Sequence, residues 1–195
     1  EKDFEDSIKN NEIFIKKITL LIDQLINEGF VKFKNKKSNI YKVLRIVSGE
    51  KQKSQSHLYH FDAHLVTILI PILIPNNENK KNGDLVIFPN IRKTHKFLLL
   101  NIIQKIFFQN NLIRYFLQLN FIKKLLNHKI IKIKPGSIYI FNGFSSLHGN
   151  LEIDQNSTRA TLLIHSHDIF KKSKLINLNR EIAIKKETQK SLLRV

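Results

Sequence analysis

Tyr59-His60-Phe61-Asp62-Ala63-His64 runs directly into the apolar residues 65–74, and the interpretation of the chain starts from this stretch. The pattern predicts a β-strand, on which side chains alternate between two faces, so that His60 and Asp62 point the same way. One imidazole nitrogen and one carboxylate oxygen can then bind a divalent metal ion, provided that a third ligand joins them. Because a surface strand can also carry this tripeptide without any function, the third ligand has to be sought elsewhere.

Length and composition limit the class of protein. The 195 residues suit a single domain, with a core at about 41–168, a helical insertion at about 94–127 and a basic tail at about 170–195. The lack of cysteine excludes disulfides and thiolate sites, and it fits a reducing compartment such as the cytoplasm. We expect no transmembrane segment and no secretory signal, and we expect that the true N-terminus precedes Glu1.

The formal net charge is +17, with 33 Lys and Arg against 16 Asp and Glu. Such an excess attracts polyanions, and nucleic acid is a possible partner on this ground. The basic residues are scattered, and Lys, Asn and Ile are abundant throughout the chain, as a biased base composition would produce. We therefore favour a solvated basic surface without a dedicated polyanion partner. The sequence indicates no particular oligomeric state.

Short extended segments lie on both sides of a helical insertion. Apolar residues at helical spacing predict an amphipathic helix over 13–28, ending before Gly29. Segments rich in β-favouring residues are separated by turns and by a polar loop at 49–56; they cover 31–36, 40–48, 59–64, 66–74, 84–88, 129–134, 137–141 and 159–165. Pro71 and Pro75 should limit the central pairing of their strand. Many short strands of this kind predict an antiparallel sandwich or barrel, mainly β with flanking helices.

The insertion at 94–127 interrupts the β pattern with two predicted buried helices, one over 97–107 and one over 112–126. We interpret them as a helical pair laid against a sheet. A dimer face and a contact with a membrane surface remain as alternatives.

His148 is the candidate for the third metal ligand. It lies far along the chain from His60, so that only the fold can bring the two histidines together. Two histidines and one carboxylate form the facial triad of non-haem Fe(II) sites. Further on, Arg159 and Thr161 share a face of their predicted strand, and a guanidinium beside a hydroxyl can bind a carboxylate.

The order of these motifs resembles the Fe(II)/2-oxoglutarate-dependent dioxygenases. The H-x-D motif, the distant histidine and the R-x-T motif match that family, and Pro-Gly-Ser-Ile-Tyr-Ile-Phe-Asn-Gly at 135–143 is similar to its strand before the distal histidine. The resemblance covers about 41–168 and is closest to the prolyl-hydroxylase-like and phytanoyl-CoA-hydroxylase-like groups. It implies a double-stranded β-helix, which is a jelly-roll, cupin-like fold of two antiparallel sheets.

The resemblance also implies roles for five residues. The catalytic metal ligands for Fe(II) would be His60, Asp62 and His148. Arg159, with Thr161, would bind the far carboxylate of the co-substrate 2-oxoglutarate, and O2 would complete the site. The implied activity is hydroxylation of a small-molecule or peptide substrate, with release of succinate and CO2. Asp62 favours hydroxylation, because a small residue replaces this aspartate in related halogenases.

Other histidines leave alternatives open. His57, His60 and His64 could form a local Zn²⁺ cluster with Asp62, although His57 has the opposite strand parity. His165 stands where the nucleic-acid demethylase branch has a second arginine, which disfavours a DNA-repair function. His165 and His167 are more readily explained as polar residues at a strand end than as cavity residues.

The alternative function is a non-catalytic, cupin-like barrel that binds a small carboxylate or a polyanion. Several further side chains could contact a ligand, and nothing in the sequence selects among them: Lys42, Arg45, Tyr59, Tyr139 and Asn142.

Overall fold

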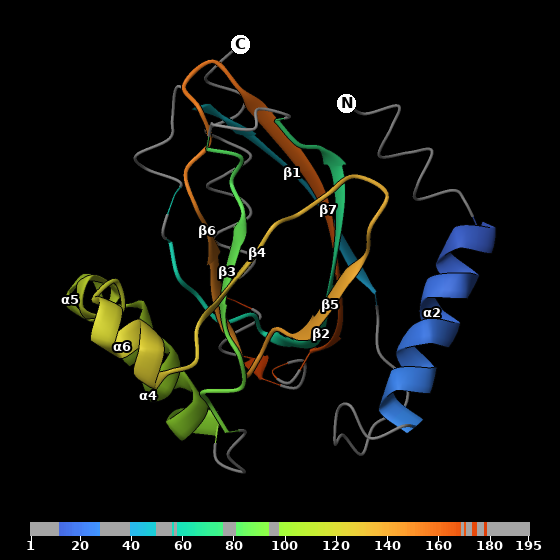
Figure 1. Cartoon of the computed structure of the whole chain (residues 1–195). Helices are drawn as coiled ribbons and strands as arrows, with labels where there is room; N and C mark the ends of the chain where they lie inside the picture. The colour runs from blue at the N-terminus through green and yellow to red at the C-terminus, as the bar shows by residue number, and fades with distance from the viewer. Residues whose placement is uncertain are drawn as a thin grey trace.

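Two facing β-sheets with helices on their outer sides form the body of the molecule in the computed structural model (Figure 1). The structure describes residues 12–27, 40–49, 56, 58–75, 81–93, 98–168, 170, 173–174 and 178. The extended segment predicted at 31–36, Gly29, His57, most of the polar loop at 49–56 and most of the basic tail lie outside the described residues.

The strands form two sheets, and the chain passes between them several times. The larger sheet has the order β1-β7-β2-β5, with β1 (Tyr41–Ser48), β7 (Thr158–Asp168), β2 (His64–Leu73) and β5 (Tyr139–Asn142). The smaller sheet has the order β4-β3-β6, with β4 (Lys129–Ile131), β3 (Leu85–Phe88) and β6 (Leu147–Asn150). All strand pairs are antiparallel. The chain changes sheet from β2 to β3, from β4 to β5, from β5 to β6 and from β6 to β7, as in a jelly roll, and the predicted fold class is confirmed.

The core has one layer between the sheets and one on the outer face of each sheet, of which the layer on the smaller sheet is described with the helices below. Between the sheets, Leu69 and Phe141 pack against Leu85 and Ile87 of β3. On the outer face, α2 (Glu12–Asn27) contributes Ile18 and Ile22, which pack against side chains of β2 and β7. The N-terminal amphipathic helix is therefore confirmed, and Figure 1 shows it lying along the larger sheet.

The expectation that the H-x-D motif lies on a strand was wrong. β2 begins at His64, so that the motif lies in an extended segment before the strand, where His60 makes a single bridge to His148. The expected limit on central pairing at Pro71 is observed. β2 lies between β7 and β5, but β5 pairs only with residues 66–69, and at Pro71 the strand pairs with β7 alone, with a shift in register before Leu73.

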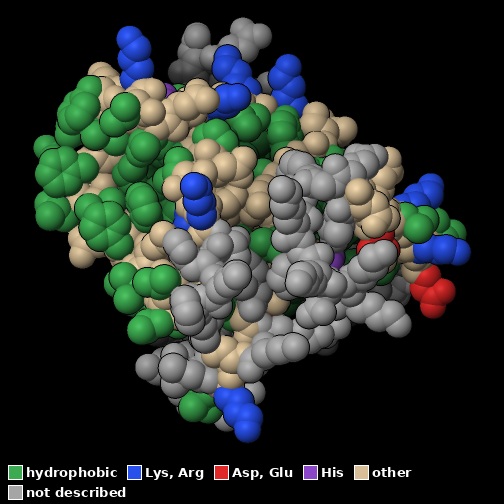
Figure 2. Space-filling model, turned by 90° about the horizontal axis from the view of Figure 1, so that it is seen from below, with side chains coloured by type: hydrophobic (Ala, Val, Ile, Leu, Met, Phe, Trp, Pro, Cys, Tyr) green, Lys and Arg blue, Asp and Glu red, His purple; other side chains and the backbone are tan. Residues whose placement is uncertain are grey.

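The insertion forms three helices where two were predicted: α4 (Leu98–Gln109), α5 (Asn111–Phe116) and α6 (Asn120–Leu125). The Asn110 side chain caps α5 by accepting a hydrogen bond from Leu112 N at 2.8 Å. The chain then leaves the helix, and Leu117 enters a cluster of buried side chains on the outer face of the smaller sheet, with Tyr59, Phe61, Val86, Phe88 and Leu147. The helices were predicted to be buried, but much of their outward surface is exposed and apolar (Figure 2).

Candidate metal centre

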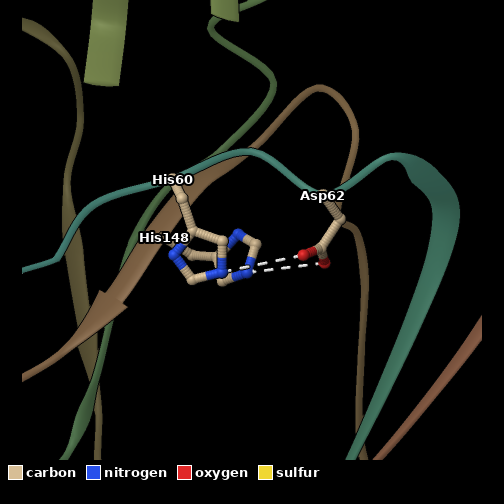
Figure 3. Close-up of side chains that lie close together, drawn as sticks. All are labelled: His60, Asp62 and His148. Carbon is tan, nitrogen blue, oxygen red and sulfur yellow. Dashed lines mark ion pairs between the residues drawn. The ribbon is translucent and has the colours of Figure 1, made fainter. Parts of the chain in front are cut away.

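The fold brings His60, Asp62 and His148 together. One ligand atom from each lies within 4.8 Å of the others. The Nε2 atom of His60 is 3.7 Å from Asp62 Oδ1, and that of His148 is 3.5 Å from Asp62 Oδ2. In Figure 3 both imidazole rings point these nitrogens toward the carboxylate. The sequence motif thus places two donors, and the jelly roll supplies the third from the facing sheet.

Backbone hydrogen bonds fix the distance between the two histidines. His60 N donates to His148 O at 2.9 Å, and His148 N donates to His60 O at 3.0 Å. On β6, Leu147 packs toward the helices, so that the alternation along the strand turns His148 toward the interior, where its ring meets Phe141 edge-on. Asp62 is held separately, because its backbone N–H donates to Gly143 O at 3.0 Å.

The second nitrogen of each ring has a backbone carbonyl beside it. His60 Nδ1 lies 2.9 Å from Leu58 O, and His148 Nδ1 lies 3.0 Å from Ser146 O. A proton on Nδ1 that is donated to these carbonyls leaves the Nε2 lone pairs free on the side of Asp62. This tautomer is the one that a metal ion requires. The donor set therefore fits a divalent metal ion such as Fe(II).

Electrostatics favour the protonation states of metal ligands. Burial lowers the pKa of His60 to about 4, and the neighbouring His148 adds to this effect. Burial opposes the ionisation of Asp62, but the imidazoles of His148, His165 and His60, with a hydrogen bond from Thr67, hold the pKa of this carboxyl below its usual range. His60 is thus neutral and Asp62 is ionised at neutral pH, and a metal ion meets no competing proton on either.

Thr67 and His165 complete the surroundings of Asp62. The Thr67 hydroxyl donates to Asp62 Oδ2 at 2.5 Å, and it lies 3.1 Å from His165 Nδ1, which is also 3.6 Å from the same carboxylate oxygen. Both residues are buried, and they face each other in the pairing of β2 with β7. The sequence interpretation ranked His165 as a strand-end residue and did not consider Thr67. A lone hydroxyl within the apolar run of β2 was the available signal.

Gly143 makes room for the aspartate. A Cβ atom at this position would lie 2.3 Å from Asp62 Oδ2 and 2.2 Å from Thr67 Oγ1, which are distances that real Cβ contacts do not reach. In the sequence, Gly143 stood out only as the last residue of the stretch at 135–143. The close approach of Asp62 adds a steric reason for glycine at this position.

We expect Gly143→Ala to weaken binding of Mn²⁺ by roughly 10- to 100-fold, the usual effect of disturbing the surroundings of a metal ligand. The added methyl group displaces Asp62 or Thr67. Calorimetry with Mn²⁺ measures the effect. Gly136→Ala is the control, since its φ of 79° also disfavours alanine while nothing lies within 4 Å of the new Cβ. Equal affinities in both variants would contradict a role for Gly143.

The strands β1 and β7 pair without irregularity, which determines the face of every residue along them. Alternate residues share a face, so that Thr161 and Arg159 lie on the same side of the sheet as His165. Thr161 pairs with Arg45 of β1, which places Arg45 on that side too. Lys42 pairs with Ile164 and belongs to the opposite face, toward α2. Of the two basic residues that the sequence left unselected on this strand, Arg45 therefore faces the site.

Arg159 is buried and partly satisfied. Its Nη1 donates to Gly83 O at 2.6 Å and its Nη2 to Asn150 Oδ1 at 3.0 Å, whereas its Nε is a buried donor without an acceptor. Burial lowers the pKa of Arg159 to about 10, and the charge of Arg45 contributes. The residue lines a partly open pocket, which none of the three clustered ligands lines.

The positive charge of Arg45 acts on both His60 and Arg159. After burial and His148, its positive charge is among the causes that lower the pKa of His60, and it acts on Arg159 as well. Within the described part of the chain, Arg45 makes no hydrogen bond or ion pair. Arg45 is half-buried and, among the residues that the structure describes, has no anionic partner. A guanidinium placed between a candidate metal site and a second guanidinium is suited to bind an anion from solution.

The remaining candidates have other surroundings. His64 stacks on His165 with ring centroids 5.2 Å apart and is not one of the converging ligands, so that the local Zn²⁺ cluster gains no support from the described residues. His167 lies beside Ser166 Oγ at 2.7 Å. The Tyr139 hydroxyl is occupied by the backbone of Lys132 and Lys134. Two further candidates serve the fold: Asn142 accepts a hydrogen bond from Ser145 N, and Tyr59 packs edge-on against Phe88.

Comparisons with known proteins find similar structures but no significant match in sequence. No family model matches the chain, and no curated protein sequence matches it significantly. A prolyl 4-hydroxylase from Phytophthora capsici is similar over 80% of this chain and 42% of its own, with 13% identity and a TM-score of 0.45. IDO from Bacillus thuringiensis is similar over 84% and 64%, with 15% identity and a TM-score of 0.46. A Pseudomonas putida prolyl-4-hydroxylase is similar over 81% and 68%, with 12% identity and a TM-score of 0.43. The chain thus spans between about two fifths and two thirds of the length of these proteins.

Proposed function

We propose that this chain is an Fe(II)- and 2-oxoglutarate-dependent oxygenase that hydroxylates a substrate and releases succinate and CO2. The observation that carries the proposal is the convergence of His60 Nε2, His148 Nε2 and the Asp62 carboxylate. Two imidazoles and one carboxylate leave coordination positions open for other ligands. When bound, iron with 2-oxoglutarate supplies the oxidising chemistry, in which one atom of O2 enters the substrate and the other enters succinate.

Each surrounding residue has a task in this proposal. The carbonyls of Leu58 and Ser146 keep the Nε2 atoms of the two histidines deprotonated. The neighbouring histidines keep the Asp62 carboxylate ionised, and the Thr67 hydroxyl orients it and adds to this effect on its pKa. The His60 side chain is 34% exposed, whereas those of Asp62 and His148 are about 10% exposed, so that the His60 side is the open one from which substrate enters.

The far carboxylate of 2-oxoglutarate binds, in this proposal, to Arg159, Thr161 and Arg45. The spacing along β7 supports the inclusion of Arg45. Thr161 is four residues from His165, or roughly 13 Å, and Arg159 is roughly 20 Å away. Thr161 and Arg45 are paired across β7 and β1. The distance from this pair to the metal site can be bridged by a five-carbon dicarboxylate together with an extended arginine side chain. Arg159 lies two residues further along β7. It contributes a positive charge and an Nε–H that has no acceptor among the described residues.

The test is a turnover assay on the purified chain. We expect succinate to form from 2-oxoglutarate only when Fe(II) is added, even without a prime substrate, because many such reactions proceed slowly uncoupled. His60→Ala should abolish this turnover, since it removes one of three ligands. Nuclear magnetic resonance detects the succinate.

Two outcomes would contradict the proposal. Turnover that His60→Ala leaves intact would show that the three residues are not the metal site. Calorimetric binding of 2-oxoglutarate in the presence of Mn²⁺, without any turnover with Fe(II), would identify a non-catalytic barrel instead.

A further inference from the structure

The outward side of α4, α5 and α6 is apolar. Ten large apolar side chains there are at least 44% exposed: Leu99, Leu100, Ile103, Ile106, Phe107, Leu112, Tyr115, Phe116, Phe121 and Leu125. We call them the helical apolar face. In Figure 2 they form the broad green area at one side of the molecule. Exposed apolar areas beyond a few hundred Å² are rare on soluble monomers and mark contact sites.

The outward side of α4 is apolar although part of its inward side is polar. Among the described inward side chains, Asn101 is buried and Gln104 is half-buried, and Phe108 packs edge-on against Phe61. Leu99, Ile103 and Ile106 face outward. A helix whose outer side contacts water carries polar residues on that side. The apolar outer side of α4 therefore indicates that it meets an apolar medium.

The charges around this face are of one sign. Between Asp84 and Glu152 the chain contains no Asp or Glu, although it contains the whole helical insertion. The charged residues on α5 and α6 are Arg114, Lys123 and Lys124, and exposed lysines follow at 129, 132 and 134. The acidic side chains visible in Figure 2 lie on the side away from the helical apolar face. A partner that complements this surface is therefore apolar where it meets the centre of the helical apolar face and anionic where it meets the rim.

We propose that the helical apolar face binds the surface of an anionic lipid bilayer. Acyl chains accept the apolar side chains, and anionic headgroups accept the lysines at the rim, as with interfacial helices that lie in the membrane plane. A second copy of this chain is a poorer occupant, because isologous pairing would bring two cationic rims together on a chain of net charge +17. None of the described helices has the length and apolar character needed to cross a bilayer, so the contact is with the surface.

The experiment is co-sedimentation of the chain with vesicles, either of phosphatidylcholine alone or with one third phosphatidylserine. We expect strong binding to the anionic vesicles and weak binding to the neutral ones. Lys123→Gln with Lys124→Gln should weaken binding to anionic vesicles by roughly 25-fold, which is roughly fivefold per lysine. Ile106→Ser with Leu125→Ser should weaken it by roughly tenfold or more.

Ile13→Ser with Leu20→Ser is the matched control. These α2 residues are 70% and 60% exposed, and α2 lies on the other side of the molecule, so binding should not change. All four positions are exposed or half-exposed, and unchanged thermal unfolding verifies the fold of each variant. Absence of sedimentation with either vesicle would overturn the proposal. So would equal losses in the control, or self-association that depends on Ile106 and Leu125, since the latter identifies a second copy as the occupant.

Discussion

Asp62→Asn is expected to lower both Mn²⁺ affinity and Fe(II)-dependent turnover by more than 100-fold. The substitution preserves the shape of the side chain and its approach to Gly143, but it removes the only anion of the proposed metal site. Loss of an outer partner of a ligand typically costs 10- to 100-fold in metal affinity, and loss of the ligand charge itself should exceed this. Calorimetry gives the affinity, and succinate formation gives the turnover.

Two further variants make the result specific. Thr67→Val removes the hydroxyl that donates to Asp62 Oδ2 and should fall within the roughly 10- to 100-fold range. Glu152→Gln removes a carboxylate from a surface ion pair with Lys81 and should leave both measurements unchanged. If Asp62→Asn retained normal Mn²⁺ affinity, the carboxylate would not be a ligand, and the assignment of this site would fail.

Arg45→Met and Arg159→Met are each expected to raise the KM for 2-oxoglutarate by roughly 10- to 100-fold, with a smaller change in kcat. Each variant removes a charge-assisted hydrogen bond to the far carboxylate, which contributes about 1.5 to 3 kcal/mol. If both guanidinium groups bind the same carboxylate, the double variant should deviate from the sum of the two single changes. Steady-state kinetics at saturating Fe(II) measures all three.

Lys42→Met is the control for these variants. It removes a cation from the same strand as Arg45, but on the face toward α2, and we expect an unchanged KM. A rise in KM for Lys42→Met equal to that for Arg45→Met would indicate a general effect of positive charge. An unchanged KM in Arg45→Met would leave Arg159 and Thr161 as the anchor and remove Arg45 from it.

The sequence predicted the fold class because alternating strands, turn residues and one helical insertion are local patterns. It did not predict the start of β2, since the extended backbone of His60 to Asp62 has the same side-chain alternation as a strand without its ladder. It predicted the limit on central pairing at Pro71, because proline has no N–H to donate, but the register shift against β7 depends on the partner strand. The second insertion helix was predicted as continuous, since the departure at Leu117 follows from a buried cluster made of distant residues.

The same distinction applies to the site. His60, Asp62 and His148 were chosen from residue type and order, and the fold brings their ligand atoms together. The contacts of Thr67, His165 and Gly143 with Asp62 could not be predicted, because they depend on cross-strand pairing and on a close contact between segments far apart in sequence. Arg45 faces the site and Lys42 faces away from it because of the register between β1 and β7. This register depends on β7 and not on the residues of β1 alone.

The paired backbone hydrogen bonds between His60 and His148 close a long loop that contains β2 to β5 and the whole helical insertion. A metal ion held by these two histidines would cross-link the two ends of that loop. A cross-link that closes a long loop lowers the conformational entropy of the unfolded chain more than one that closes a short loop. In addition, a ligand that binds only the folded state stabilises the folded protein more as the ligand concentration rises. Removal of a metal ion from the proposed site would then lower the stability of the folded protein as well as any metal-dependent activity.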